Sequence, residues 1–127
     1  MSMYNEWPMI NEPNTPVDLR DRSLEFSRRI LQFAKTIPQD TITRPIIVQL
    51  VKSATSVGAN FVEAKNASSK RDFRNKVFIS KKEASETIYW LKLLDEFTDK
   101  PELEKLKVEC QEIILILQKI INTLGHQ

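Results

Sequence analysis

The clearest structural signal in the sequence is residues 103–124, LEKLKVECQEIILILQKIINTL. Its apolar residues recur at intervals of three and four positions, which places them on one face of an α-helix. The members of this stripe are Leu103, Leu106, Cys110, Ile113, Leu117, Ile120 and Leu124. The pattern predicts a long amphipathic helix that follows a turn at residues 98–101 and stops at Gly125.

Three earlier segments of the chain repeat this spacing. Their apolar stripes run over residues 19–37, 47–64 and 73–94, and none of the six prolines interrupts one. The members are Leu19, Ser23, Phe26, Ile30, Phe33 and Ile37 in the first stripe; Ile47, Leu50, Ala54, Val57, Phe61 and Ala64 in the second; and Phe73, Val77, Ser80, Ala84, Thr87, Leu91 and Leu94 in the third.

Prolines and a capping residue separate these helices. Pro16 and Pro45 suit the first turn of a helix, with Pro45 predicted to open the second helix, and Ser69 is a candidate N-cap for the third. Short connections make consecutive helices antiparallel neighbours. The sequence therefore predicts an all-α, up-down-up-down four-helix bundle over residues 16–127, preceded by a flexible N-terminal arm over residues 1–15.

Composition excludes several other classes of protein. The chain has 127 residues, enough for one domain, and only two glycines, which argues against β-sandwiches, barrels and glycine-rich phosphate loops. No run of apolar residues is long enough to span a membrane, and no signal peptide is visible. The single cysteine, Cys110, fits a reducing compartment, so we expect a cytoplasmic protein without a membrane.

Residues for metal or nucleophilic chemistry are scarce. The only histidine is His126, and no Glu-x-x-His pair occurs, although di-metal bundles use such pairs. Cys110 is several helical turns away from His126, which disfavours a thiol–imidazole pair. We therefore predict no metal, no cofactor and no enzymatic activity.

More apolar residues are present than four stripes require. The additional ones are Val17, Leu24 and Leu31; Phe78, Ile79, Ile88, Tyr89, Trp90, Leu93 and Phe97; and Val108 and Leu115. One interpretation is a wide core with scattered exposed apolar residues, which are normal on protein surfaces. The other is burial of the excess between subunits of a homo-oligomer.

Small and polar residues interrupt the second and third stripes. Gly58 is in the middle of a predicted helix, where glycine costs about 1 kcal/mol relative to alanine, so we expect a neighbouring helix to approach closely there. Ser80, Ala84 and Thr87 are the matching small residues on the third helix. Polar residues beside them are Ser53, Ser56, Asn60, Glu63, Glu83 and Glu86. These residues indicate either close packing of the second and third helices or a polar site.

A cluster of positive charge spans residues 65–82. It contains seven basic residues and one acidic residue, Asp72, whereas the whole chain has a net charge of +2. Such a cluster is either a solvated helix face or a phosphate-binding surface. We take six of the seven as candidate nucleic-acid-binding residues: Lys65, Lys70, Arg71, Arg74, Lys81 and Lys82. The seventh is Lys76. No RNA- or DNA-binding motif is present.

Three runs in this region resemble a known family. They are residues 53–64, SATSVGANFVEA; residues 69–73, SKRDF; and residues 82–94, KEASETIYWLKLL. Over about residues 18–124 the chain is similar to the bacterial four-helix-bundle family of 23S ribosomal RNA intervening-sequence proteins. That family includes the accessory variability determinant protein of diversity-generating retroelements. The resemblance implies a role in the fold or in an interface for six residues of the family motif: Gly58, Asn60, Glu63, Glu83, Glu86 and Trp90.

The resemblance also carries functional expectations. It implies a homopentamer, and its retroelement members look like nucleic-acid-binding partners of a reverse transcriptase. The sequence thus favours a non-enzymatic oligomer that associates with RNA or DNA through a repeated basic surface. The alternative is a protein-interaction scaffold without a nucleic-acid ligand, for example an accessory subunit of a reverse transcriptase, with the arm around Trp7 as one docking element.

Overall fold

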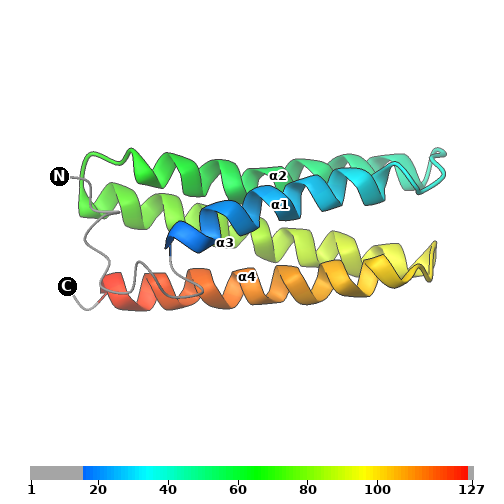
Figure 1. Cartoon of the computed structure of the whole chain (residues 1–127). Helices are drawn as coiled ribbons and strands as arrows, with labels where there is room; N and C mark the ends of the chain where they lie inside the picture. Colours follow the sequence, from blue (N-terminus) through cyan, green and yellow to red (C-terminus); the bar gives the residue numbers. More distant parts are fainter. Residues whose placement is uncertain (1–15, 126–127) are drawn as a thin grey trace.

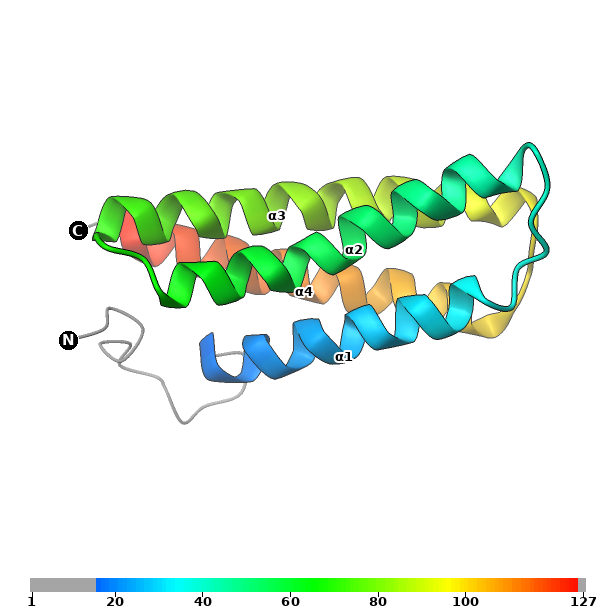
Figure 2. The same ribbon diagram turned by 90° about the horizontal axis from the view of Figure 1, so that it is seen from above.

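The computed structural model describes residues 16–125, which form four α-helices and one short 3-10 turn. The elements are α1 (Pro16–Ala34), α2 (Thr43–Lys65), α3 (Lys70–Leu93), η2 (Leu94–Glu96) and α4 (Pro101–Gly125). The α1–α2 and α3–α4 connections lie at one end of the rod and the α2–α3 connection at the other (Figures 1 and 2). The predicted all-α, antiparallel four-helix bundle is confirmed. The predicted arm over residues 1–15, and His126, lie outside the described residues.

Local hydrogen bonds set where the helices begin. Asp40 Oδ1 accepts hydrogen bonds of 2.8 Å from the backbone N–H groups of Ile42 and Thr43, so α2 begins at Thr43, two residues before the predicted Pro45. Ser69 caps α3 as expected, because its Oγ accepts a 3.0 Å hydrogen bond from the backbone N–H of Asp72. Each such cap satisfies amide groups that the first helical turn leaves without a partner.

The four stripes meet in one continuous core. Every stripe residue is buried except Leu124, which is half-buried. Phe26, Phe61 and Phe73 are the largest of the fully buried side chains. Burial of each such side chain stabilises the fold by about 1.5–3 kcal/mol, which explains why spacing alone predicts the core.

The helices form a closed ring of neighbours in which α1 contacts α2 and α4, and α3 contacts the same two helices. Hydroxyl groups join α2 to α3: Ser80 Oγ donates to the Val57 carbonyl at 2.7 Å, and Thr87 Oγ1 is 2.8 Å from Ser53 Oγ. Charged side chains join α1 to α4, where Arg22 Nε donates to Glu109 Oε2 at 3.0 Å. The α2–α3 contact therefore includes hydroxyl hydrogen bonds, whereas the α1–α4 contact includes ion pairs.

Most of the surplus apolar residues lie at the surface. Among those whose side chains the structure describes, Ile88, Trp90 and Leu93 are half-buried, none is fully buried, and Leu115 is 69% exposed. The large apolar side chains exposed to solvent are Leu24, Leu31, Ile42, Val48, Val62, Phe78, Ile79, Tyr89, Phe97, Val108 and Leu115. A wide core thus accounts for only part of the surplus.

Within residues 16–125, no helix combines the length and the apolar character that crossing a bilayer requires.

Candidate nucleic-acid interface

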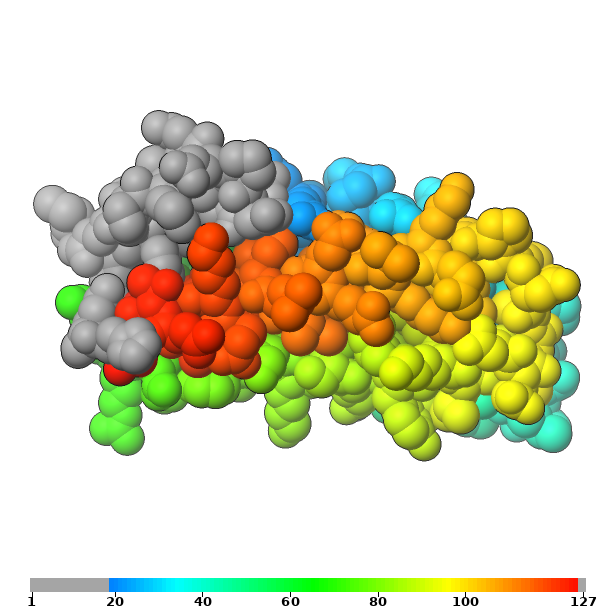
Figure 3. Space-filling model, turned by 90° about the horizontal axis from the view of Figure 1, so that it is seen from below, coloured from blue at the N-terminus to red at the C-terminus, as the bar shows by residue number. Residues whose placement is uncertain are grey.

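The basic cluster occupies the α2–α3 corner and the first half of α3. Lys65 is the last residue of α2, and Lys70 and Arg71 form the first turn of α3. In Figure 3, α3 (green to yellow) runs beside α4 (orange to red), and several of its side chains project beyond the bundle. The Ser69 cap fixes the start of α3 and therefore the direction in which its cations point.

Five of the six candidate cations, namely Lys65, Lys70, Arg71, Arg74 and Lys82, are exposed, and Lys81 is half-buried. Among residues 19–125, no carboxylate forms an ion pair with Lys70, Arg71, Arg74, Lys81 or Lys82. Their charges are therefore not neutralised by the described part of the chain.

Lys76 behaves differently from its neighbours in the cluster. Its Nζ is 2.8 Å from Glu63 Oε2 on α2, and this hydrogen bond raises the pKa of the lysine. Lys76 therefore faces α2, whereas none of Lys70, Arg71, Arg74, Lys81 and Lys82 forms an ion pair with Glu63. Lys76 thus links α3 to α2, and no sequence pattern predicts this pairing because the two residues belong to different helices.

Basic and acidic residues of α3 lie mainly on different sides of the helix. At 100° per residue, Lys70, Arg74 and Lys81 share one row along the helix. Glu83 and Glu86 fall on the flank that carries Lys76 and Trp90, on the side of α2. The outer surface of α3 is therefore more positive than the composition of the whole helix indicates.

An aromatic ring lies beside the basic row. The guanidinium carbon of Arg74 is 4.8 Å from the centre of the Phe78 ring, a cation–π contact, and Phe78 is 40% exposed. The sequence showed Phe78 only as a surplus apolar residue. An arginine four positions before an aromatic residue on a helix is the signal that could have identified the contact.

The hydrogen bonds of the motif residues join Glu86 to Trp90 and otherwise involve residues outside the motif. Asn60 Nδ2 donates to the Ser56 carbonyl at 2.8 Å within α2, and Glu63 pairs with Lys76. Glu86 Oε2 accepts from Trp90 Nε1 at 3.0 Å, and Glu83 is half-buried. Within residues 16–125, no three histidine, cysteine or acidic side chains are grouped so as to hold a metal ion.

A neighbouring helix approaches Gly58 closely, as predicted, and the structure identifies which helix it is. A Cβ at this position would be 3.1 Å from Ser23 Oγ and 3.3 Å from Ser23 Cβ, so the close approach is to α1 and not to α3. The small residues of α3 instead meet Ser53 and Val57. Periodicity placed all of them on buried flanks but could not assign a neighbour to each flank.

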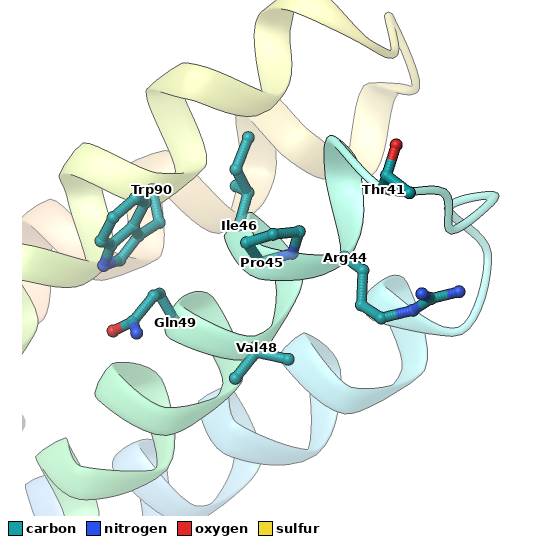
Figure 4. A pocket seen from close by; sticks show the side chains of 7 residues that line it. All are labelled: Thr41, Arg44, Pro45, Ile46, Val48, Gln49 and Trp90. Atoms are coloured by element: carbon teal, nitrogen blue, oxygen red, sulfur yellow. The ribbon is translucent and has the colours of Figure 1, made fainter.

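Trp90 borders a hollow at the start of α2. The hollow has a volume of about 520 Å³ and is lined by Thr41, Arg44, Pro45, Ile46, Val48, Gln49 and Trp90. In Figure 4, Gln49 lies near the indole ring, whereas Arg44 points away from it and Thr41 lies on the α1–α2 connection. The polar groups therefore do not converge on one point.

A larger groove of about 680 Å³ lies between α1 and α2. It is lined by Arg20, Asp21, Ser23, Leu24, Ser27, Thr55, Gly58, Ala59 and Val62. Leu24 and Val62 are 52% and 44% exposed. Ser23 and Gly58 are its buried small residues, and its exposed lining combines apolar Leu24 and Val62 with charged Asp21.

These features define the class of protein: an all-α four-helix bundle with a basic, aromatic-bearing helix face. The family model described as 23S rRNA-intervening sequence protein matches residues 16–119. The chain therefore belongs to the 23S rRNA-intervening sequence protein family.

A solved structure supports the same assignment. The crystal structure of a protein of unknown function from the S23 ribosomal protein family of Bacteroides thetaiotaomicron VPI-5482 is 36% identical in sequence, with a TM-score of 0.73. The similarity covers 84% of this chain and 97% of that chain. None of the curated proteins compared with the chain matches it.

Proposed function

We propose that this protein is a non-enzymatic, oligomeric protein that binds RNA or DNA through the basic face of α3. The binding residues are Lys65, Lys70, Arg71, Arg74, Lys81 and Lys82. Neutralisation of phosphates by such side chains releases counterions and supplies the sequence-independent part of nucleic-acid affinity.

The placement of charge at the start of α3 carries this proposal. The N-terminus of a helix is the positive end of its dipole, so Lys70 and Arg71 in the first turn weaken the helix slightly. Only Asp72 offsets them in that turn. Residues that oppose local stability are expected where function requires them.

Self-association would multiply a weak contact. The apolar side chains exposed on α1 and α2 provide surface for contacts between copies, and we propose a homo-oligomer, with a homopentamer as the form that the family resemblance implies. Several copies of the basic face on one particle bind a long polyanion with higher avidity than one copy.

Nucleic-acid binding is tested with a five-site variant in which Lys70, Arg71, Arg74, Lys81 and Lys82 are changed to glutamine. We expect at least a tenfold loss of affinity for a fluorescent RNA, measured by anisotropy, and a shallower dependence on salt.

The matched control removes five exposed cations elsewhere: Arg28, Lys35, Lys52, Lys105 and Lys119. Both variants lower the net charge equally, so their difference isolates the face of α3. Equal losses in the two variants would show that only bulk charge matters, and unchanged affinity in the first would discard this face as the binding site.

The groove between α1 and α2 favours a second candidate, a scaffold that holds another protein. Its exposed apolar residues Leu24 and Val62 suit a helix of a partner or of a second copy. Native mass measurement of the wild type and of a Leu24→Glu, Val62→Glu variant separates these cases. A mass that falls to a single subunit in the variant identifies the groove as the contact between copies, whereas an unchanged assembly leaves it for another protein.

A further inference from the structure

We propose that the outer face of α3 binds single-stranded nucleic acid and stacks unpaired bases on Phe78 and Tyr89. This inference rests on the proposed function, because it specifies which form of nucleic acid the basic face prefers. The structural basis is the alternation of exposed rings and cations along one helix face.

The two rings are aligned. Phe78 and Tyr89 are eleven residues apart, which corresponds to three turns, about 16.5 Å of axial rise and a rotation of only about 20°. Both side chains point outward, with exposed fractions of 40% and 58%. They therefore lie on one row of the helix and can contact the same extended strand.

Cations accompany each ring. Arg74 lies one turn before Phe78 with its guanidinium over the ring, and Lys82 lies one turn after it. Lys92 is three residues beyond Tyr89 and is exposed. An exposed aromatic or guanidinium plane beside a phosphate-binding cation is the arrangement that proteins use to hold single strands without reading sequence.

A duplex cannot use the rings in this way. Its bases are stacked on one another inside the helix, so it offers phosphates to the cations but no base face to Phe78 or Tyr89. The cations alone would bind both forms, whereas the rings add affinity only for unpaired bases. A second copy of the chain is the other possible occupant of this face, but the uncompensated positive charges there favour a polyanion.

The test compares a labelled 20-nucleotide oligo(dT) with a 20-base-pair duplex. The variants are Phe78→Leu and Tyr89→Leu, which keep an apolar side chain, and Phe97→Leu, which removes an exposed ring outside the row. Stacking is worth about 1–3 kcal/mol per base, so each ring variant should lose about fivefold or more in affinity for oligo(dT). Duplex affinity and the Phe97→Leu control should be unchanged, and Phe78→Trp should retain single-strand affinity.

The possible results are distinguishable. If the five-site charge variant loses affinity for both probes while the ring variants bind normally, the proposed function stands and stacking is wrong. If wild-type protein binds neither probe, both proposals fail. If the ring variants change the native mass and not the binding, the face is a contact between copies, and the stacking proposal is overturned. Circular dichroism of each variant verifies that the bundle is intact.

Discussion

Helix α2 and the α1–α4 edge both hold neighbouring helices together, but they do so with different side chains. On both flanks α2 uses small residues and hydroxyls: Gly58 receives Ser23 of α1, and Val57 receives the hydroxyl of Ser80 from α3. The α1–α4 edge uses long charged side chains, with Arg22 and Arg29 of α1 reaching acidic residues of α4. Close approach is sensitive to volume, whereas a charged bridge at the surface is sensitive to salt.

The largest effect on stability is expected from adding volume at Gly58. A Gly58→Val change inserts two methyl groups beyond a Cβ that already meets Ser23 at 3.3 Å, so the free energy of unfolding should fall by about 2–3 kcal/mol. Urea denaturation measures this. Ala59→Val is the control, since Ala59 is exposed and should lose only about 0.5 kcal/mol from helix propensity. Equal losses at the two positions would contradict the close approach of α1 to α2.

A smaller effect is expected from removing the hydroxyl that joins α3 to α2. Ser80 is fully buried and donates to the Val57 carbonyl at 2.7 Å. Ser80→Ala should lower the free energy of unfolding by about 1 kcal/mol, the usual net value of one hydrogen bond. Ser85→Ala, at an exposed position of the same helix, should be neutral or slightly stabilising. The prediction is wrong if the two alanine variants have the same midpoint of urea denaturation.

Charge removal at the α1–α4 edge should have a weaker and salt-dependent effect. Arg22 bridges Glu109 and Glu112, and these hydrogen bonds and charges raise the pKa of its guanidinium. Arg22→Met keeps the apolar stem and should lower stability by about 0.5–1 kcal/mol at low ionic strength. Most of that loss should vanish at 1 M salt, where the Debye length is about 3 Å. The control is Arg28→Met, at an exposed residue whose nearest acid, Glu25, is 3.8 Å away. A loss that persists undiminished at high salt would show that Arg22 acts through packing instead.

The flank of α4 that faces α3 is buried, and the reactivity of Cys110 tests this burial without any substitution. Burial raises the pKa of this thiol to about 12, and its Sγ donates to the Ala84 carbonyl at 3.3 Å. At pH 8 the thiolate is therefore rare, and alkylation by iodoacetamide should be about a thousandfold slower than in urea-unfolded protein. Rapid labelling of the folded protein at pH 8 would show that the α3–α4 flank opens.

Much of the fold was predictable because helices are specified by local spacing. The stripes of α1 to α4 predicted their buried faces, and Ser69 was identified as a cap from its place before the third helix. The start of α2 was predicted two residues too late, at Pro45. The helix begins at Thr43 because Asp40 accepts a hydrogen bond from the backbone N–H of Thr43.

The candidate site was less predictable for a physical reason. The sequence located the basic cluster, but a linear count treats Lys76 and Arg74 alike, although one pairs with Glu63 and the other lies over Phe78. The roles of Lys65, Lys70, Arg71, Lys81 and Lys82 in binding remain a proposal, to be decided by the charge variants.

The residue pattern was sufficient to specify four amphipathic helices, their antiparallel order and the residues that fill the core, because apolar spacing and short connections are local properties of the chain. Tertiary structure alone decided that Gly58 meets α1, that Glu63 neutralises Lys76, and that Phe78 and Tyr89 point away from the core. Those outcomes depend on how each helix is rotated about its axis and which neighbour it meets, and neither quantity is encoded in the spacing of a single helix.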